Sequence, residues 1–262
     1  MRKAILLSIV VLTAVGAVAQ PPRPPVRIIL VGDSTVAIHN GWGPGFCDIL
    51  VPQVTCVNMA KNGRSSSSYR AEGLWSSVLN ELKRNAEFHA TYVLIQFGHN
   101  DQPGKPGRST DLATEFPANL KRYVEDVKTA GAKAVLITSL TRRSFQNGEL
   151  KNDLVPWADA TKKVAADEGV PVLDLNSESA AAVQQMGPVE ANTLAMAPPP
   201  AVVAESAASG TSAPAPKNES TAAGAPVFDY THLGAKGSAF FGRMVTEELV
   251  KAVPELREYV GR

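Results

Sequence analysis

A surplus of charge of either sign is missing from this chain. Its 262 residues include 26 Lys and Arg against 25 Asp and Glu, which gives a formal net charge of +1. Nucleic-acid-binding proteins usually carry a clustered basic excess, so we expect no nucleic-acid partner. Aromatic residues are also scarce, at 6%, and the hydrophobic content of 44% is carried largely by Ala, Val and Leu. That content suffices for one sizeable core, and we expect one domain.

Long hydrophobic runs are missing too, apart from one near the first residue. Ala4–Val15 is apolar, follows two basic residues, and is too short for a comfortable membrane span. The small residues Ala17-Val18-Ala19 behind it complete the pattern of a secretory signal peptide. We therefore predict a signal peptide over residues 1–19, a Pro-rich segment over residues 20–25, and export to the periplasm or the cell exterior. An uncleaved N-terminal anchor is the alternative.

Cysteine is limited to Cys47 and Cys56. In an oxidising compartment they could pair and close a short loop between a predicted helix and the next strand. Two small buried thiols fit the sequence equally well, because pairing depends on geometry that a sequence does not give. No His, Cys and carboxylate residues cluster with metal-ligand spacing, so we expect neither a metal nor another cofactor.

Apolar runs alternate with helix-like segments through the rest of the chain. The runs predict five buried strands, over Val26–Val31, Val54–Asn58, Tyr92–Phe97, Ala134–Leu140 and Val170–Asp174. The segments between and after them predict helices, over Trp42–Leu50, Leu74–Arg84, Glu115–Ala130, Pro156–Glu168 and Gly234–Val253. Continuous apolar strands separated by helices are typical of a parallel sheet that is covered on both faces.

One segment breaks this alternation. Residues 197–226 are mostly Ala, Pro, Ser, Gly and Thr, without an aromatic residue. Such a composition lacks the apolar side chains needed to offset the entropy of ordering the chain. We expect a disordered, low-complexity insertion here, which is either inert padding or a mobile lid.

Short polar motifs follow the first three predicted strands. They are Gly32-Asp33-Ser34, Asn62-Gly63-Arg64 and Gly98-His99-Asn100-Asp101. In open parallel sheets ligands bind beyond the carboxyl ends of the strands, so these motifs are expected at one edge of the sheet. A serine hydroxyl there can attack an electrophile, while backbone amides and an Asn amide can hold an oxyanion. Taken alone, each motif is also compatible with a turn or a helix cap.

A base for the serine is found before the last predicted helix. Asp229 precedes His232 by three residues, a spacing that can place the carboxylate against the imidazole. Asp174, after the fifth strand, is the rival acid, and its simpler role is to cap the helix that follows. The other histidines are less suitable. His39 lacks a well-spaced carboxylate, His89 lies at the wrong end of a strand, and His99 points sideways from the Asn100 turn.

The four motifs, in this order, resemble those of the SGNH (GDSL-like) hydrolase family. The sequences GDSTVA, NGRSSSSYRAEG, FGHND and DYTHLGAKG look like its rhamnogalacturonan acetylesterase branch. The resemblance implies a flavodoxin-like, three-layer α/β/α sandwich with a five-stranded parallel sheet, over residues 26–262 apart from the insertion. It also implies roles for the motif residues, as catalytic triad (Ser34, Asp229, His232) and as oxyanion hole (Ser34, Gly63, Asn100).

What the resemblance implies for activity is an exported serine esterase that needs no metal. It would remove O-acetyl groups from plant cell-wall polysaccharide, pectin or rhamnogalacturonan, through an acetyl-Ser34 intermediate. We expect a monomer whose partner is the acetylated polysaccharide or oligosaccharide, with no membrane attachment beyond the export signal. The alternatives are a lipase or thioesterase of the same family and a non-catalytic glycan-binding module.

Residues near the second motif are candidates for substrate binding. Galacturonate chains are anionic and arginine suits carboxylates, and aromatic rings can stack on sugars although they often belong to the core. The candidates are Arg64, Tyr69, Arg70 and Trp42, with Trp75 as a further stacking residue. For Arg64, a salt bridge to Asp33 or Asp101 is the simpler alternative.

Overall fold

The computed structural model describes residues 24–212 and 227–261, and its centre is the expected five-stranded parallel sheet. In spatial order the strands are β2 (Val54–Asn58), β1 (Val26–Gly32), β3 (Ala90–Gln96), β4 (Lys133–Ile137) and β7 (Val172–Leu173). Side chains along β1 alternate between two hydrophobic clusters, one on each face of the sheet, because successive residues of a strand point to opposite faces. The predicted fold class is confirmed.

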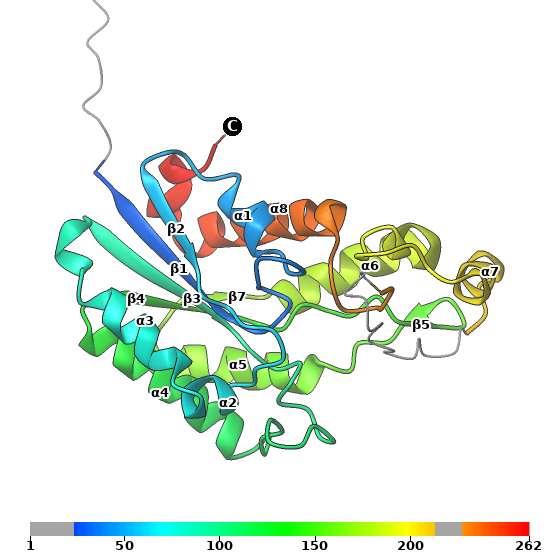
Figure 1. Ribbon diagram of the computed structural model, residues 1–262, viewed down its shortest axis with the longest axis horizontal. Helices are drawn as coiled ribbons and strands as arrows, with labels where there is room; N and C mark the ends of the chain where they lie inside the picture. The colour runs from blue at the N-terminus through cyan, green and yellow to red at the C-terminus, as the bar shows by residue number, and fades with distance from the viewer. Residues whose placement is uncertain (1–23, 213–226, 262) are drawn as a thin grey trace, which may run out of the picture.

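Helices cover both faces of this sheet and make it the middle of three layers (Figure 1). One face is covered by α1 (Gly43–Cys47), α6 (Leu175–Asn192) and α8 (Ala235–Ala252). The other face is covered by α3 (Leu74–Leu82), α4 (Glu115–Thr129) and α5 (Val155–Glu168). Each of the helices predicted from the sequence is present, and its ends lie at most three residues from the predicted ones.

The strand order decides where the polar motifs meet. Because β2 lies on one side of β1 and β3 on the other, the chain leaves β1 at a switch in strand order, where open α/β sheets bind ligands. The last paired residues of β1 and β3 are Gly32 and Gln96. The loop after β1 is therefore flanked by the loops after β2 and β3, and these three loops carry Ser34, Gly63 and Asn100.

Two glycines let α1 and α8 approach each other closely. A Cβ atom on Gly45 would lie 2.2 Å from the Ser238 carbonyl oxygen, and one on Gly242 would lie 2.4 Å from the Gly45 carbonyl carbon. No other residue fits at either position without moving a backbone. Since α8 begins soon after His232, this contact brings His232 beside the loop that follows β1.

A disulfide joins α1 to β2 close to that contact. Cys47 and Cys56 are paired, with their Cα atoms 5.8 Å apart, which lies within the usual range for disulfides. The sequence left this pairing open, and the structure decides it.

Several elements have no counterpart among the predicted ones. Besides short helical turns and α6, which was expected only as a helix capped by Asp174 and without a range, they are α2 (Ser68–Ala71), the hairpin of β5 (Phe145–Gln146) and β6 (Glu149–Leu150), and α7 (Ala201–Ser209). The last corrects the expectation of disorder over residues 197–226, which is wrong for the described part of that segment. Its Ala and Glu residues favour a helix, and Val203, 2% exposed, packs α7 beside α6.

The predicted signal peptide and the rest of the insertion lie outside the described residues. Across residues 24–212 and 227–261, none of the helices combines the length and the hydrophobicity that crossing a bilayer requires.

Candidate active site

Three side chains from two distant parts of the chain form a hydrogen-bonded row. The Ser34 hydroxyl lies 2.9 Å from Nε2 of His232, and Nδ1 of the same ring lies 2.6 Å from Oδ2 of Asp229. In this order the imidazole can take the hydroxyl proton while the carboxylate orients the ring. The structure therefore brings together the three residues that the sequence assigned to catalysis.

Asp229 and His232 share one tight turn directly before α8. Oδ1 of Asp229 accepts the backbone N–H groups of Thr231 and His232, both at 2.6 Å, which leaves Oδ2 for the imidazole. Burial alone would raise the pKa of the Asp229 carboxyl, but His232 and the two amide donors lower that pKa below its ordinary value. The turn thus favours the carboxylate form that the imidazole needs as an acceptor.

The rival acid, Asp174, caps a helix instead. It is the N-cap residue of α6, where its carboxylate accepts the Ser177 hydroxyl at 2.9 Å and the Ser177 amide at 3.4 Å. Its other partners within the described chain are Lys162 and Thr138. These contacts agree with the capping role and leave Asp229 as the acid beside His232.

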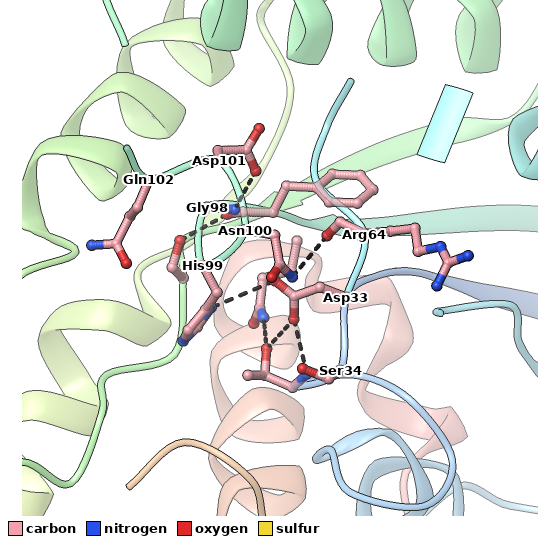
Figure 2. Close-up of polar contacts among 12 residues, drawn as sticks. Asp33, Ser34, Arg64, Gly98, His99, Asn100, Asp101 and Gln102 are labelled. Atoms are coloured by element: carbon pink, nitrogen blue, oxygen red, sulfur yellow. Dashed lines mark hydrogen bonds and ion pairs between the residues drawn. The ribbon is translucent and has the colours of Figure 1, made fainter. Parts of the chain in front are cut away.

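The three expected oxyanion donors lie in one pocket with the triad. Gly63 has a φ of +75°, in the left-handed region that favours glycine. In the described part of the chain, the backbone amides of Ser34 and Gly63 donate to no protein acceptor. Asn100 donates one N–H to the Arg64 carbonyl oxygen at 3.0 Å (Figure 2), so its second N–H is left for a ligand.

A buried polar network supports the nucleophile loop from behind. Oδ1 of Asp33 accepts both the amide and the hydroxyl of Thr35, and the Thr35 hydroxyl accepts from the Gln96 side chain. Figure 2 shows the His99 ring turned toward Asp33, with Nδ1 of the ring 3.5 Å from Oδ2. Burial acts to raise the pKa of Asp33, but His99 and Thr35 lower it overall. The sequence assigned no role to His99, and this contact fixes the residue beside the nucleophile.

A second buried carboxyl holds the Gly63 and Asn100 loops together. Asp101 accepts the Ser66 amide and hydroxyl, the Thr110 hydroxyl and the Gly98 amide. Burial raises the pKa of Asp101 to about 6 in spite of these donors. The contacts tie the loop after β2 to the loop after β3, which sets the separation of the oxyanion donors.

The pocket that contains these groups has a volume of about 380 Å³ and a polar lining. Its walls include no Val, Leu, Ile, Met, Phe, Tyr or Trp. The lining residues are Ser34, Asn40, Asn62, Gly63, His99, Asn100, Lys105, Arg108, Arg142, Asp229, Thr231 and His232. The sequence analysis did not predict the three cations of this lining, Lys105, Arg108 and Arg142. Their positions in the loops after β3 and β4 could have indicated them, since the loops at that edge of the sheet surround the ligand.

None of the substrate-binding residues expected from the sequence lines this pocket, and two of them belong to the core. Trp42 is fully buried and donates to Gln96 at 3.0 Å, while Tyr69 is 1% exposed and donates to the Met59 carbonyl oxygen.

The remaining candidates are engaged in the same way. Arg70 and Trp75 both donate to Asp126, and Arg64 forms an ion pair with Glu72 rather than with Asp33 or Asp101. None of these side chains lines the pocket.

Sequence reasoning also missed Arg143, which lies behind the Asp229–His232 turn. Its side chain is fully buried. Burial lowers the pKa of Arg143 to about 10, against the opposing attraction of Asp229. A buried arginine gives no signal in the sequence, where Arg142-Arg143 has the composition of an exposed loop.

Comparisons with known proteins show the family to which the chain belongs. A family model described as GDSL-like Lipase/Acylhydrolase family matches residues 30–240. Two curated proteins of Bacillus subtilis (strain 168) are similar in sequence. Rhamnogalacturonan acetylesterase RhgT is 34% identical over 180 residues, covering 66% of this chain and 74% of its own. The probable rhamnogalacturonan acetylesterase YesY is 32% identical over 168 residues, covering 62% and 75%.

Solved structures share the fold. The Bacillus subtilis protein YxiM superposes with a TM-score of 0.65 at 22% identity, covering 87% of this chain and 56% of its own. A catalytic mutant of Axe2, an acetylxylan esterase from Geobacillus stearothermophilus, superposes with a TM-score of 0.55 at 15% identity, covering 85% and 93%. With the family match spanning residues 30–240, this chain belongs to the GDSL-like lipase/acylhydrolase family, the SGNH hydrolases, and is a carboxylic ester hydrolase.

Proposed function

We propose that this protein removes O-acetyl groups from an acidic plant cell-wall polysaccharide, with the rhamnogalacturonan backbone of pectin as its substrate. The observation that carries the proposal is the Asp229–His232–Ser34 row inside a polar pocket. The choice of polysaccharide is supported by the two relatives named as rhamnogalacturonan acetylesterases. The enzyme acts as a monomer in this proposal.

The reaction is acyl transfer through an acetyl-Ser34 intermediate. The Ser34 oxygen attacks the acetyl carbonyl carbon as Nε2 of His232 takes the hydroxyl proton, and N–H groups of Ser34, Gly63 and Asn100 hold the resulting oxyanion. The bond to the sugar oxygen then breaks, and that oxygen takes the proton from His232. Water, deprotonated by His232, attacks the acetyl carbon, and the departure of acetate restores the Ser34 hydroxyl.

The composition of the pocket favours a short acyl group over a fatty one. A long acyl chain needs apolar surface to leave water, and the lining offers polar and charged groups instead. A lipase or thioesterase is therefore the weaker alternative. The intact row of Ser34, His232 and Asp229 argues against a module that only binds glycans.

Export is part of the proposal. Residues 1–19 have the parts of a signal peptide, and the Cys47–Cys56 disulfide suits an oxidising compartment. Protein recovered from outside the cytoplasm should begin at Gln20, which intact-mass measurement determines. A chain that keeps residues 1–19 would indicate the anchor instead.

The decisive experiment measures acetate release from acetylated rhamnogalacturonan and hydrolysis of p-nitrophenyl acetate. The parent protein should act on both and should cleave p-nitrophenyl octanoate more slowly than the acetate. Ser34→Ala should lower both activities by at least about 10⁴-fold while the protein stays folded. An unchanged rate in Ser34→Ala would overturn the nucleophile, and faster cleavage of the octanoate would favour a lipase.

A further inference from the structure

We infer that Lys105 and Arg108 form a carboxylate-binding subsite in the pocket, through which the enzyme distinguishes acetylated chains that carry uronate groups from neutral ones. The inference rests on the proposed function, because it names what the same pocket recognises beside the acetyl ester. It replaces the substrate-binding residues expected from the sequence, which lie elsewhere.

The two cations lie close to the reacting groups. Both belong to the loop after β3, the loop that carries Asn100, and both line the pocket that contains Ser34. Nη1 of Arg108 is 3.4 Å from the Gly63 carbonyl oxygen and 3.5 Å from Oδ1 of Asn100. A carboxylate held by Arg108 would thus belong to the acetylated sugar or to its immediate neighbour in the chain.

Neither cation forms an ion pair with a carboxylate of the described residues. Within the described residues, no carboxylate lies within ion-pair distance of Lys105 or Arg108, and Arg108 contacts only neutral oxygens. The third cation of the pocket is different, since Arg142 lies 2.6 Å from Asp153 and donates to Gln102 at 2.7 Å. Two of the three charges are therefore left available to an anion.

The cations also repel one another. Burial lowers the pKa of Lys105, and the positive charges of Arg142 and Arg108 lower it further, against weaker attraction from Asp33 and Asp153. Holding like charges close together in a partly desolvated pocket costs free energy of folding. A bound anion would relieve that repulsion, and groups kept in such an arrangement are commonly found at functional sites.

The chemistry of the pair suits a carboxylate on a flexible sugar chain. The guanidinium of Arg108 presents five N–H donors in a planar fork that matches the two oxygens of a carboxylate, and the Lys105 ammonium adds a mobile point charge. The polar neighbours Asn40, Asn62 and Thr231 line the same pocket and can bind sugar hydroxyls.

The test compares two oligosaccharides that differ only in the carboxylate. Trigalacturonate and α-1,4-galactotriose are used as inhibitors of p-nitrophenyl acetate hydrolysis, and calorimetry repeats the comparison without turnover. For the parent protein, trigalacturonate should bind at least about tenfold more tightly than galactotriose, and added salt should reduce the difference. Inorganic phosphate at the same concentration shows whether any anion suffices.

Lys105→Met should remove most of that tenfold preference, because the proposed subsite holds the uronate groups of the chain. The matched control is Lys163→Met. It removes the same charge from an exposed position on α5, where Lys163 pairs with Asp167, and it should keep the preference. Should Lys105→Met fail to fold, Lys105→Gln and the salt dependence of the parent carry the test.

Equal binding of the two oligosaccharides by the parent, or the same preference in Lys105→Met and Lys163→Met, would overturn the subsite. Inhibition by phosphate as strong as that by trigalacturonate would overturn recognition of the uronate. Failure of the proposed function would give a result different from failure of the subsite. In that case no acetate is released from acetylated pectin, while carboxylate-dependent binding of trigalacturonate persists and still supports the subsite.

Discussion

The buried guanidinium of Arg143 donates through Nη2 to the carbonyl oxygen of His232 at 2.8 Å. The same nitrogen donates to the carbonyl oxygen of Asp229 at 2.9 Å, and Nη1 donates to that of Thr231 at 3.3 Å. The backbone amide of Arg143 completes the set by donating to the Tyr230 carbonyl oxygen at 2.8 Å. Every residue of the turn that carries the base and its acid is thus bonded to one arginine, which acts as a positioning residue.

Replacement of Arg143 should disturb the reaction more than the binding of substrate. Arg143→Met keeps much of the side-chain volume but removes the three side-chain donors, so the turn can shift and the imidazole can leave the Ser34 hydroxyl. A displacement of about 1 Å in a catalytic group lowers the reaction rate by on the order of 10²-fold. We expect kcat on p-nitrophenyl acetate to fall by about that factor with little change in KM. In Arg143→Ala, added guanidinium at millimolar concentration should restore part of the rate.

Arg27 provides the control for lost stability. It is 1% exposed, donates to Asn85 at 2.6 Å and lies over the Phe88 ring, at the opposite end of the sheet. Arg27→Met should lower the free energy of unfolding about as much as Arg143→Met does, but it should leave kcat of the folded protein unchanged. If kcat falls equally in Arg143→Met and Arg27→Met, or if guanidinium does not restore any of the rate of Arg143→Ala, the positioning role is wrong.

The identity of the triad acid gives a second prediction. Asp229→Asn removes the carboxylate beside Nδ1 of His232 and favours the wrong tautomer of the ring, so kcat should fall by about 10⁴-fold. Asp174→Asn should leave kcat unchanged, since this residue caps α6 and asparagine is an equally good N-cap. Rates on p-nitrophenyl acetate compare the two. A larger loss in Asp174→Asn would make Asp174 the acid.

The central sheet could be predicted from the sequence because its strands are local patterns. Val26–Gly32 and Ala90–Gln96 are buried on both faces, and such strands are continuous apolar runs that need no knowledge of their neighbours. The triad could be predicted because Asp229 and His232 are three residues apart and belong to one turn. The pairing of Cys47 with Cys56 could not, since it depends on how α1 packs against β2.

Substrate-binding residues could not be predicted because exposure is a property of the packed protein. Trp42 and Tyr69 have the same side chains in a core as on a sugar platform, and here Gln96 and the Met59 carbonyl oxygen take their donors. Lys105 and Arg108 belong to a loop without regular structure, whose path depends on the Asp101 contacts. The helix at Ala201–Ser209 could not be predicted from composition, because a low-complexity segment has few apolar side chains, whereas here Val203 is buried in the packed protein.

The lowered pKa of Lys105 predicts how binding of an acidic ligand depends on pH. Burial and the neighbouring cations favour the neutral amine, so the ammonium loses its proton, as pH rises, at a lower pH than an ordinary lysine does. Affinity for trigalacturonate should fall on the alkaline side in that range. Lys105→Arg keeps its charge throughout and should move the fall to higher pH. Inhibition constants measured across the pH range check this, and identical profiles for the two proteins would contradict it.

The contact between α1 and α8 links packing to the active site. Adding one methyl group in Gly242→Ala would place Cβ 2.4 Å from the backbone of Gly45 and of Phe46, neither of which is a flexible side chain. In an open helix the same substitution is stabilising by about 1 kcal/mol, but here the two helices must separate, so we expect the free energy of unfolding to fall by about 1–3 kcal/mol. Because α8 follows His232, separation also lengthens the 2.9 Å contact of His232 with Ser34, and kcat should fall in the folded fraction.

The control is Arg243→Ala, at the neighbouring exposed position. Its free energy of unfolding should stay within about 0.5 kcal/mol of the parent. Urea unfolding and p-nitrophenyl acetate rates measure both effects, and a Gly242→Ala protein as stable as the parent would show that the helices can part without cost.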